Sequence, residues 1–319
     1  MTFAGIKIGH STDHEHHTGC TVFLCPERTV ASVDVRGPAP GSREAALLAP
    51  DKPIEYVNAV VFSGGSAFGL ATADGAMRYL AEKGIGHFTP IRPIPIVPAA
   101  IVYDLFLGGG EHLPGAEMGY AACLDAAQQA DGAELPQGNV GAGAGVTVGK
   151  WAGFQTMMKG GFGLAQETIG EVEIAAAAVV NAVGDILAPD GSVLAGARSP
   201  AGQWLATQDP YRRFADRPPA GDDLALGTNT TLVLVATNAP LNKIGCNRLS
   251  QRAHDALAIA IRPAHTTHDG DTVFALATGR VEPAPFDLLA NVAVEVVAEA
   301  IRNAVRHASS VAGVPGLAG

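Results

Sequence analysis

Charged residues are scarce in this sequence. Asp, Glu, Lys and Arg together make up 16% of its 319 residues, whereas hydrophobic residues make up 47%. A chain of this length buries a substantial core, but so few charges leave little polar material to cover the surface. Alanine explains part of the apolar excess. For the rest, we expect surface that is buried between the subunits of a homo-oligomer.

Clusters of basic residues and long apolar runs are missing as well. No run of Lys and Arg exceeds a pair and the net charge is −10, which argues against nucleic acid or an anionic membrane as a partner. Apolar runs such as residues 174–180 fall far short of the roughly 18 residues that span a bilayer. The opening MTFAGIKIGH lacks the basic and apolar regions of a secretory signal.

Cysteine is rare too. The four cysteines form no CxxC pair, so we expect reduced thiols in a cytoplasmic protein. They are Cys20, Cys25, Cys123 and Cys246.

The first half of the chain predicts alternating strands and helices. The first 35 residues contain short β-type runs, and residues 58–86 read as a strand, a glycine turn and a helix. For that helix Ser66 is the expected N-cap and Gly84 the expected end. Residues 90–105 contain too many prolines for an interior strand throughout, and residues 117–131 have helical character.

The second half continues this pattern, which indicates a mixed α/β architecture. The unbroken apolar run within residues 171–187 predicts a central strand covered on both faces. Residues 197–226 lose all periodicity, and a structureless loop of that length is uncommon unless it is functional or mobile. Asn247 is the expected cap of a following helix. Further strands are expected over 230–237 and 272–279, and helices over 248–261 and 285–308.

Several familiar motifs are approached but not completed. GNVGAGAGVTVGK has Val146 and Val148 where a dinucleotide-binding fingerprint needs glycine, and Ala144 and Trp151 where a P-loop needs Gly and Ser or Thr. GGSAFG has Phe68 where a nucleophile elbow needs glycine. The sequence therefore predicts no nucleotide cofactor.

Two histidine-containing stretches, residues 10–20 and 265–271, hold side chains of the metal-binding type. The spacing of the first matches no standard closed site, and the second lacks a further ligand cluster. An exposed loop and a turn before a strand fit them better, and we expect no metal.

The stretch LGTNTTLVLVATNA, residues 226–239, places polar residues directly before a β-branched run. A threonine hydroxyl can attack the carbonyl of the residue before it, and hydrolysis of the resulting ester leaves threonine as a new N-terminus. Cleavage between Asn229 and Thr230 would give Thr230 a nucleophilic hydroxyl and an α-amine with a reference pKa of about 8, a well-matched base. A polar turn entering a strand fits the same residues, and from the pattern alone it is the stronger interpretation.

A set of motifs spread nearly end to end resembles the family of L-aminopeptidase/D-amidase-esterases, which also holds β-peptidyl aminopeptidases and nylon-oligomer (aminohexanoate) endohydrolases. The motifs are IKIGHSTD…TGCTVFL, DVRGPAPGSREAALL, VVFSGGSAFGLATADGAMRYL, VPAAIVYDL, GNVGAGAGVTVGK…MKGGFG, VVNAVGDI, NTTLVLVATNA and RLSQRAHDALAIAIRPAHTTHDGDTVFALATG.

The resemblance implies a single domain with the fold of a four-layer αββα sandwich, similar to N-terminal-nucleophile hydrolases but with different connectivity. It implies a chain that cuts itself into an α fragment, residues 1–229, and a β fragment, residues 230–319. A mobile linker over about 197–227 would precede the cut. The nucleophile of the family matches Thr230.

The resemblance also implies further site residues. Asn181 matches the asparagine that stabilises the oxyanion. Asp269 and Asp271 match an acidic pair whose Asp-x-Asp form is that of the nylon-oligomer branch. A carboxylate there would orient the amine of Thr230 and tune its pKa.

Tyr103 and Lys150 match cleft residues, with Lys159 as the alternative to Lys150. Without the resemblance, Asn181 fits a turn, Tyr103 a core residue and the acidic pair a solvated turn. We expect His254 and His265 to be structural.

The resemblance thus implies an amide hydrolase that acts on linear amides such as aminohexanoate oligomers. The alternatives are an aminopeptidase that releases N-terminal L- or β-amino acids, a non-catalytic unprocessed member and, least supported, a metal hydrolase. The expected partners are a small amide or peptide substrate and other copies of the chain, as a tetramer of processed pairs.

Overall fold

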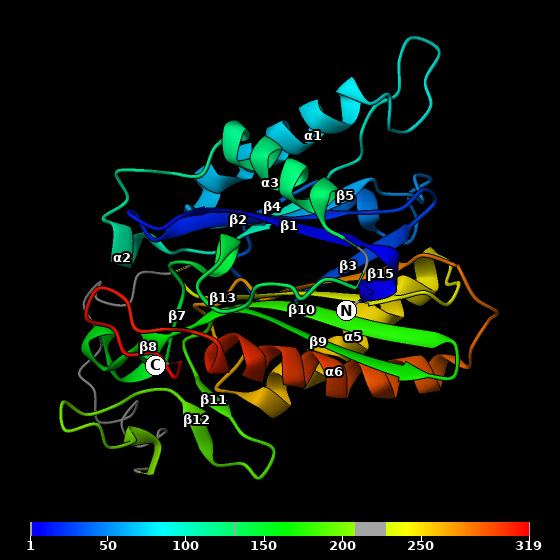
Figure 1. Cartoon of the computed structure of the whole chain (residues 1–319). Coiled ribbons are helices and arrows are strands. Elements are labelled where there is room, and N and C mark those ends of the chain that lie inside the picture. Colours follow the sequence, from blue (N-terminus) through cyan, green and yellow to red (C-terminus); the bar gives the residue numbers. More distant parts are fainter. Residues whose placement is uncertain (1, 131, 208–227, 319) are drawn as a thin grey trace.

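The computed structural model describes residues 2–130, 132–207 and 228–318 (Figure 1). Ten strands form its two large sheets. They are β1 (Lys7–Asp13), β2 (Thr18–Leu24), β3 (Val30–Val35), β4 (Ser42–Arg43), β5 (Ala59–Ser63), β6 (Ala99–Ile101), β9 (Gly161–Ile169), β10 (Val172–Asn181), β13 (Thr230–Thr237) and β15 (Thr272–Ala277).

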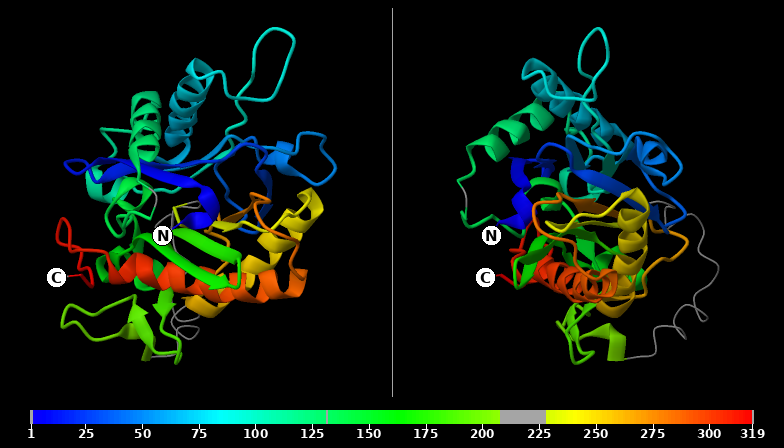
Figure 2. Two further views of the ribbon diagram at one scale, coloured as in Figure 1. Left: turned by 45° about the vertical axis from the view of Figure 1, so that its right-hand side comes forward. Right: turned by 90° about the vertical axis from the view of Figure 1, so that its right-hand side faces the viewer.

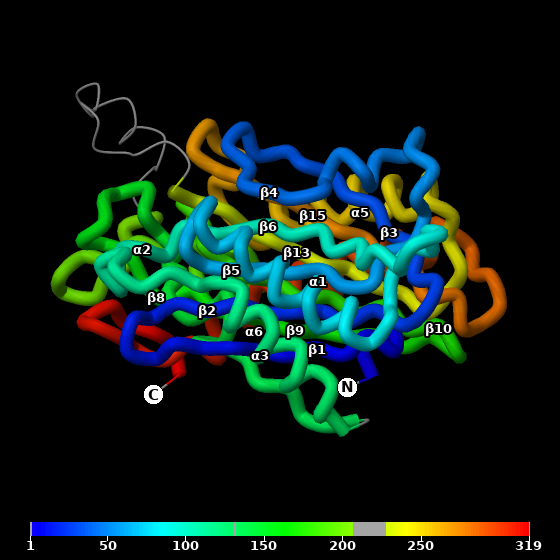
Figure 3. The backbone as a smooth tube through the Cα atoms, turned by 90° about the horizontal axis from the view of Figure 1, so that it is seen from above, coloured from blue at the N-terminus to red at the C-terminus, as the bar shows by residue number. Residues whose placement is uncertain are grey.

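The two sheets lie face to face, and their strands run in roughly the same direction (Figure 3). The first sheet has the order β1-β2-β5-β6-β4 and the second the order β3-β15-β13-β10-β9. A buried apolar layer that includes Phe23, Phe62 and Phe274 fills the space between them.

Helices cover the two outer faces (Figures 1 and 2). Helices α1 (Thr72–Glu82) and α3 (Ala116–Gln128) pack on the first sheet, and α5 (Lys243–Ala260) and α6 (Phe286–Arg306) pack on the second. The expected four-layer αββα sandwich is therefore confirmed. Shorter elements complete it: α2 (Leu105–Gly108), β7 (Thr147–Val148), β8 (Met158–Lys159), β11 (Asp185–Leu187), β12 (Val193–Ala195) and β14 (Ile261–Arg262).

The apolar run within residues 171–187, predicted as a central strand, forms β10 in the second sheet. Strand β10 lies between β9 and β13, antiparallel to both. Its residues from Ile174 to Asn181 are all buried, because the first sheet covers one face and α6 the other. Small alanine side chains let both layers come close to it.

Two predicted helix caps are wrong. Ser66 has a left-handed backbone with φ 53° and begins a 3-10 segment, so α1 begins only at Thr72. Helix α5 begins before Asn247, and Asn242 caps it by accepting the Gly245 N–H. Gly84 follows the end of α1 with φ 68°, as expected of a helix-ending glycine.

The start of the expected linker makes defined contacts. Ala197 is buried and its carbonyl accepts the Leu205 N–H at 3.0 Å, while Arg198 pairs with Trp204. Residues 208–227 lie outside the described residues. Within the described part of the chain, no helix is long and apolar enough to cross a membrane.

Candidate active site

The second sheet brings the expected site residues to one of its ends. Strand β13 runs antiparallel to β10 and parallel to β15, so the start of β13 lies beside the end of β10 and the start of β15. Thr230 is therefore the cross-strand partner of Asn181. Asn229 forms a parallel bridge with Asp269.

The hydroxyl of Thr230 lies against the carbonyl group that precedes it. Thr230 Oγ1 donates to the Asn229 carbonyl oxygen at 2.5 Å, and the Gly270 N–H donates to the same oxygen at 2.9 Å. Thr230 is 3% exposed, so water has little access to this carbonyl. Among the described residues, Asn229 Oδ1 is buried without a hydrogen-bond partner, which is a costly arrangement for an amide.

The side chain of Asn181 makes hydrogen bonds with both ends of its amide. Its Nδ2 donates to the carbonyl oxygens of Tyr103 at 2.9 Å and Thr228 at 3.0 Å. Its Oδ1 accepts from Lys150 Nζ at 2.8 Å and from the Thr147 N–H at 3.1 Å. Because Lys150 can only donate, it binds the oxygen of the amide, and the nitrogen therefore faces Thr228. Both amide hydrogens point toward backbone carbonyl groups.

Tyr103 reaches this amide through its backbone carbonyl. The ring of Tyr103 packs instead on Phe106, at 5.0 Å between ring centroids, and Phe106 packs on Phe154 at 4.3 Å. The three rings thus form a row that begins at Tyr103, the residue whose backbone carbonyl accepts from Asn181.

Both candidate lysines are fully buried, and Lys150 is the one that contacts Asn181. Burial lowers the pKa of Lys150 to about 7, against the opposing charge of Asp269. Lys159 Nζ donates to the carbonyl oxygens of Ala144 and Val146. Burial lowers its pKa to about 7 as well.

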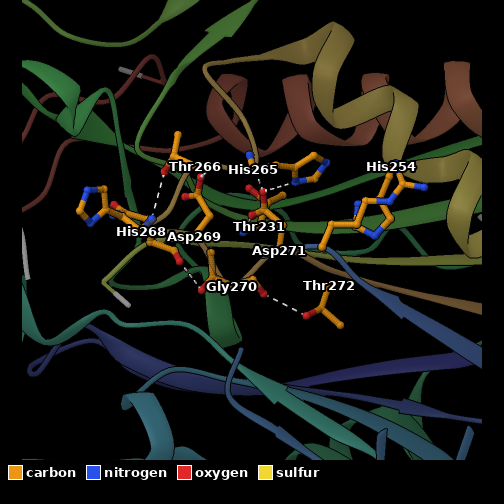
Figure 4. Close-up of polar contacts among 12 residues, drawn as sticks. Thr231, His254, His265, Thr266, His268, Asp269, Gly270, Asp271 and Thr272 are labelled. Atoms are coloured by element: carbon orange, nitrogen blue, oxygen red, sulfur yellow. Dashed lines mark hydrogen bonds and ion pairs between the residues drawn. The ribbon is translucent and has the colours of Figure 1, made fainter. Parts of the chain in front are cut away.

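The two carboxylates have different environments (Figure 4). Asp271 accepts the Thr231 N–H at 2.7 Å, and its other oxygen lies 2.8 Å from His265 Nδ1. Asp269 accepts the Thr266 N–H at 2.6 Å. Burial, followed by the nearby charge of Asp271, raises the pKa of Asp269 to about 6.

Sequence reasoning missed two residues of this group. His265 was expected to be structural, yet its ring contacts one carboxylate of the pair. Gly270 was treated only as part of a turn, yet its N–H reaches the carbonyl oxygen of Asn229. The Gly270 contact depends on how the turn at residues 265–271 folds back on β13, and the His265 contact depends on how that turn closes on itself. No sequence motif indicates either contact.

The arrangement suits acyl transfer. A buried hydroxyl lies against a polarised carbonyl, an amide donor lies on the neighbouring strand, and two carboxylates and a lysine surround them. In the part of the chain that the structure covers, no three His, Cys, Asp or Glu side chains are grouped to hold a metal ion.

Comparison with known proteins gives one family. A family model described as peptidase family S58 matches residues 3–318. An uncharacterised aminopeptidase of Mycobacterium leprae is 39% identical over 98% of this chain and 91% of its own length. A 6-aminohexanoate-oligomer endohydrolase of Paenarthrobacter ureafaciens is 29% identical over 88% of this chain and 75% of its own.

Solved structures with the same fold include two aminopeptidases. A β-aminopeptidase of a Burkholderia species superposes with a TM-score of 0.70 at 21% identity, covering 98% of this chain and 88% of its own. The L-aminopeptidase D-Ala-esterase/amidase of Ochrobactrum anthropi superposes with a TM-score of 0.69 at 19% identity, covering 95% and 84%. At these identities the likeness shows the fold alone.

Proposed function

Because this chain belongs to peptidase family S58 and is a hydrolase of amide or peptide bonds, we propose that it cuts itself between Asn229 and Thr230. Thr230 then serves as an N-terminal nucleophile. The observation that carries this proposal is the 2.5 Å contact between Thr230 Oγ1 and the carbonyl oxygen of Asn229. This hydrogen bond polarises the carbonyl group that an N-to-O acyl shift would attack and keeps the hydroxyl beside it.

Cleavage changes the state of two groups. The nitrogen of Thr230 becomes a free α-amine, whose reference pKa of about 8 suits a general base near neutral pH. The carbonyl of Thr228 now belongs to a free chain end. In the intact chain this carbonyl accepts one N–H of the Asn181 side chain. Once the chain end moves away, that N–H becomes available to a substrate.

The proposed turnover uses these groups in order. Thr230 Oγ1 attacks the substrate carbonyl, the α-amine takes the hydroxyl proton, and Asn181 stabilises the oxyanion. Loss of such a donor typically lowers the rate by about 10²–10³. The substrate amine leaves with the proton, and water hydrolyses the ester on Thr230.

The surrounding charges support this assignment. Asp271 binds the N–H of Thr231, the residue after the nucleophile, so a carboxylate lies close to the new ammonium group. Asp269 has a raised pKa, so it can exchange a proton near neutral pH. Lys150 holds Asn181 Oδ1, which keeps the Nδ2 hydrogens directed into the site.

The proposed substrates are linear amides such as aminohexanoate oligomers. The Asp-x-Asp pair and the threonine nucleophile support this choice, as does the similarity to proteins named 6-aminohexanoate-oligomer endohydrolases. A second candidate is release of N-terminal amino acids. The similarity at 37–39% identity to mycobacterial proteins named aminopeptidases favours it.

An N-blocked oligomer separates the two candidates. An endohydrolase cuts it internally, whereas an aminopeptidase leaves it intact and cuts only the unblocked form. Thr230→Ala should abolish both activities, because the proposal assigns the nucleophile of both to the Thr230 hydroxyl. Hydrolysis that persists in this variant contradicts the proposal.

We also propose a homotetramer of processed pairs in the cytoplasm. The low fraction of charged residues supports assembly. So does the exposed apolar arm of residues 85–95, where Phe88 is 80% and Ile91 90% exposed. The four free cysteines support a reducing compartment.

A further inference from the structure

We propose that self-cleavage and substrate turnover use different oxyanion donors, and that the backbone N–H of Gly270 is the donor for self-cleavage. This inference rests on the proposed function. Its starting point is that the carbonyl oxygen of Asn229, which becomes the oxyanion when Thr230 attacks, accepts the Gly270 N–H at 2.9 Å.

Asn181 is committed elsewhere in the intact chain. Its two Nδ2 hydrogens are directed to the carbonyl oxygens of Tyr103 and Thr228. The carbonyl of Thr228 belongs to the peptide group one residue before the one that breaks. The side chain assigned to turnover therefore makes no hydrogen bond to the reacting carbonyl before cleavage.

The Thr230 hydroxyl cannot fill this role. It also donates to the Asn229 oxygen, but it loses its hydrogen when it attacks. Of the two hydrogen bonds that described residues donate to this carbonyl, only that of Gly270 persists while negative charge grows on the oxygen.

The peptide group of Gly270 is held in place before the reaction. Its N–H shares a peptide plane with the carbonyl of Asp269, which accepts the Ala39 N–H at 3.1 Å. The carbonyl of Gly270 itself accepts from Thr272 Oγ1 at 2.9 Å (Figure 4). A donor fixed in this way needs no reorganisation as charge develops.

Glycine is required by the close approach at this position. A Cβ on residue 270 would lie 2.8 Å from Thr230 Oγ1 and 2.7 Å from the Ala39 carbonyl oxygen. The backbone can therefore reach the scissile carbonyl only if no side chain is present.

The step balances without a further reactant except water. The Thr230 Oγ1–H bond breaks and a bond from Oγ1 to the Asn229 carbonyl carbon forms, while the carbonyl π pair moves onto the oxygen that Gly270 holds. When that pair returns, the C–N bond breaks and the Thr230 nitrogen takes the proton. Water then hydrolyses the ester to the Asn229 carboxylate and the Thr230 hydroxyl.

An amide-to-ester change tests the donor directly, because it removes one N–H and adds no side chain, although it also weakens the preceding carbonyl as an acceptor. Gly270 is replaced by glycolic acid in the full chain made by cell-free synthesis, and intact mass follows self-cleavage over time. The matched control is the same replacement at Gly138. The N–H of that buried glycine donates to the Phe162 carbonyl at 2.7 Å, on the far side of β9 from the reacting bond.

We expect the ester at 270 to slow self-cleavage by about 10² or more, and the ester at 138 to leave the rate within about threefold. The kcat per cleaved molecule should fall much less than the cleavage rate. Equal cleavage rates for the two esters, or a fall in kcat that matches the fall in cleavage rate, would overturn the inference. An unmodified chain that never cuts would instead refute the proposed function itself.

Discussion

His265, which the sequence favoured as structural, contacts Asp271, and it carries the first prediction. We expect His265→Ala to lower turnover about tenfold, because Asp271 loses a hydrogen-bond partner at 2.8 Å and such a bond to a charged group contributes about 1.5–3 kcal/mol. His265→Asn should recover part of the loss, since its amide offers a donor near the position of Nδ1. Steady-state kinetics across pH measures both.

The matched control is His14→Ala, at an exposed position of the loop between β1 and β2. Activity of His265→Ala within about twofold of this control would mean that the ring is only structural.

The buried lysines predict how stability depends on pH. The pKa of each falls from 10.5 to about 7 in the folded chain, so between these values the unfolded chain binds more protons. Stability must therefore rise with pH in this window, by at most about 1.4 kcal/mol per pH unit for each lysine. Denaturant unfolding at about pH 7 and about pH 8.5 measures the slope.

Lys150→Met should reduce this slope, whereas the exposed Lys52→Met should not. The same slope in Lys150→Met as in the unchanged chain would show that Lys150 stays protonated when folded.

For single residues, the sequence predicted which residues belong to the site better than it predicted which partners they contact. The resemblance pointed to Thr230 and Asn181, and the β10–β13 register makes them cross-strand partners. The contact of His265 with Asp271 follows from how one turn closes on itself, and that of Gly270 with Asn229 follows from how the same turn lies against a distant strand. No local pattern encodes the contact between turn and strand, since the two are some forty residues apart in the chain, as the bond from Thr231 to Asp271 shows.

The crossing of α1 and α3 carries a prediction at the scale of elements. Ala normally stabilises an open helix interior by about 1 kcal/mol relative to Gly. At Gly119, however, a Cβ would lie 1.8 Å from the Thr72 carbonyl oxygen of α1. We expect Gly119→Ala to destabilise the fold by about 1–3 kcal/mol, measured by denaturant unfolding.

Gly115→Ala is its control, because a Cβ there meets nothing within 4 Å. A Gly119→Ala variant as stable as the unchanged chain would show that the helices separate at little cost.

Strand and helix positions were largely predictable, but the first residues of α1 and α5 were not. The apolar run of β10 and the alternating elements around it have strong periodic signals. The starts of α1 and α5 depend instead on a 3-10 segment before Thr72 and on the Asn242 cap. Near the start of each helix lies another polar residue, Ser66 for α1 and Asn247 for α5. From the local sequence alone, each fits an N-cap equally well.

Assembly is a property of the whole molecule, and the arm of residues 85–95 tests it. The arm stands away from the body of the protein (Figure 2), held by two hydrogen bonds between His87 and Ile94. We expect Phe88→Asp to reduce the mass measured by light scattering, because it places a charge on a surface that assembly would bury.

The control is Ala127→Asp, on the exposed face of α3, which should leave the mass unchanged. A monomeric unchanged chain, or equal masses for both variants, contradicts the proposed assembly.

The proposed self-cleavage would make the nucleophile and release the oxyanion donor in a single event, so the whole account depends on it. The most direct test is the mass of the purified, denatured protein. Two species are expected, residues 1–229 and residues 230–319, with Thr230→Ala giving one intact chain. A single uncut species from a preparation that hydrolyses amides, with activity retained in Thr230→Ala, would contradict it.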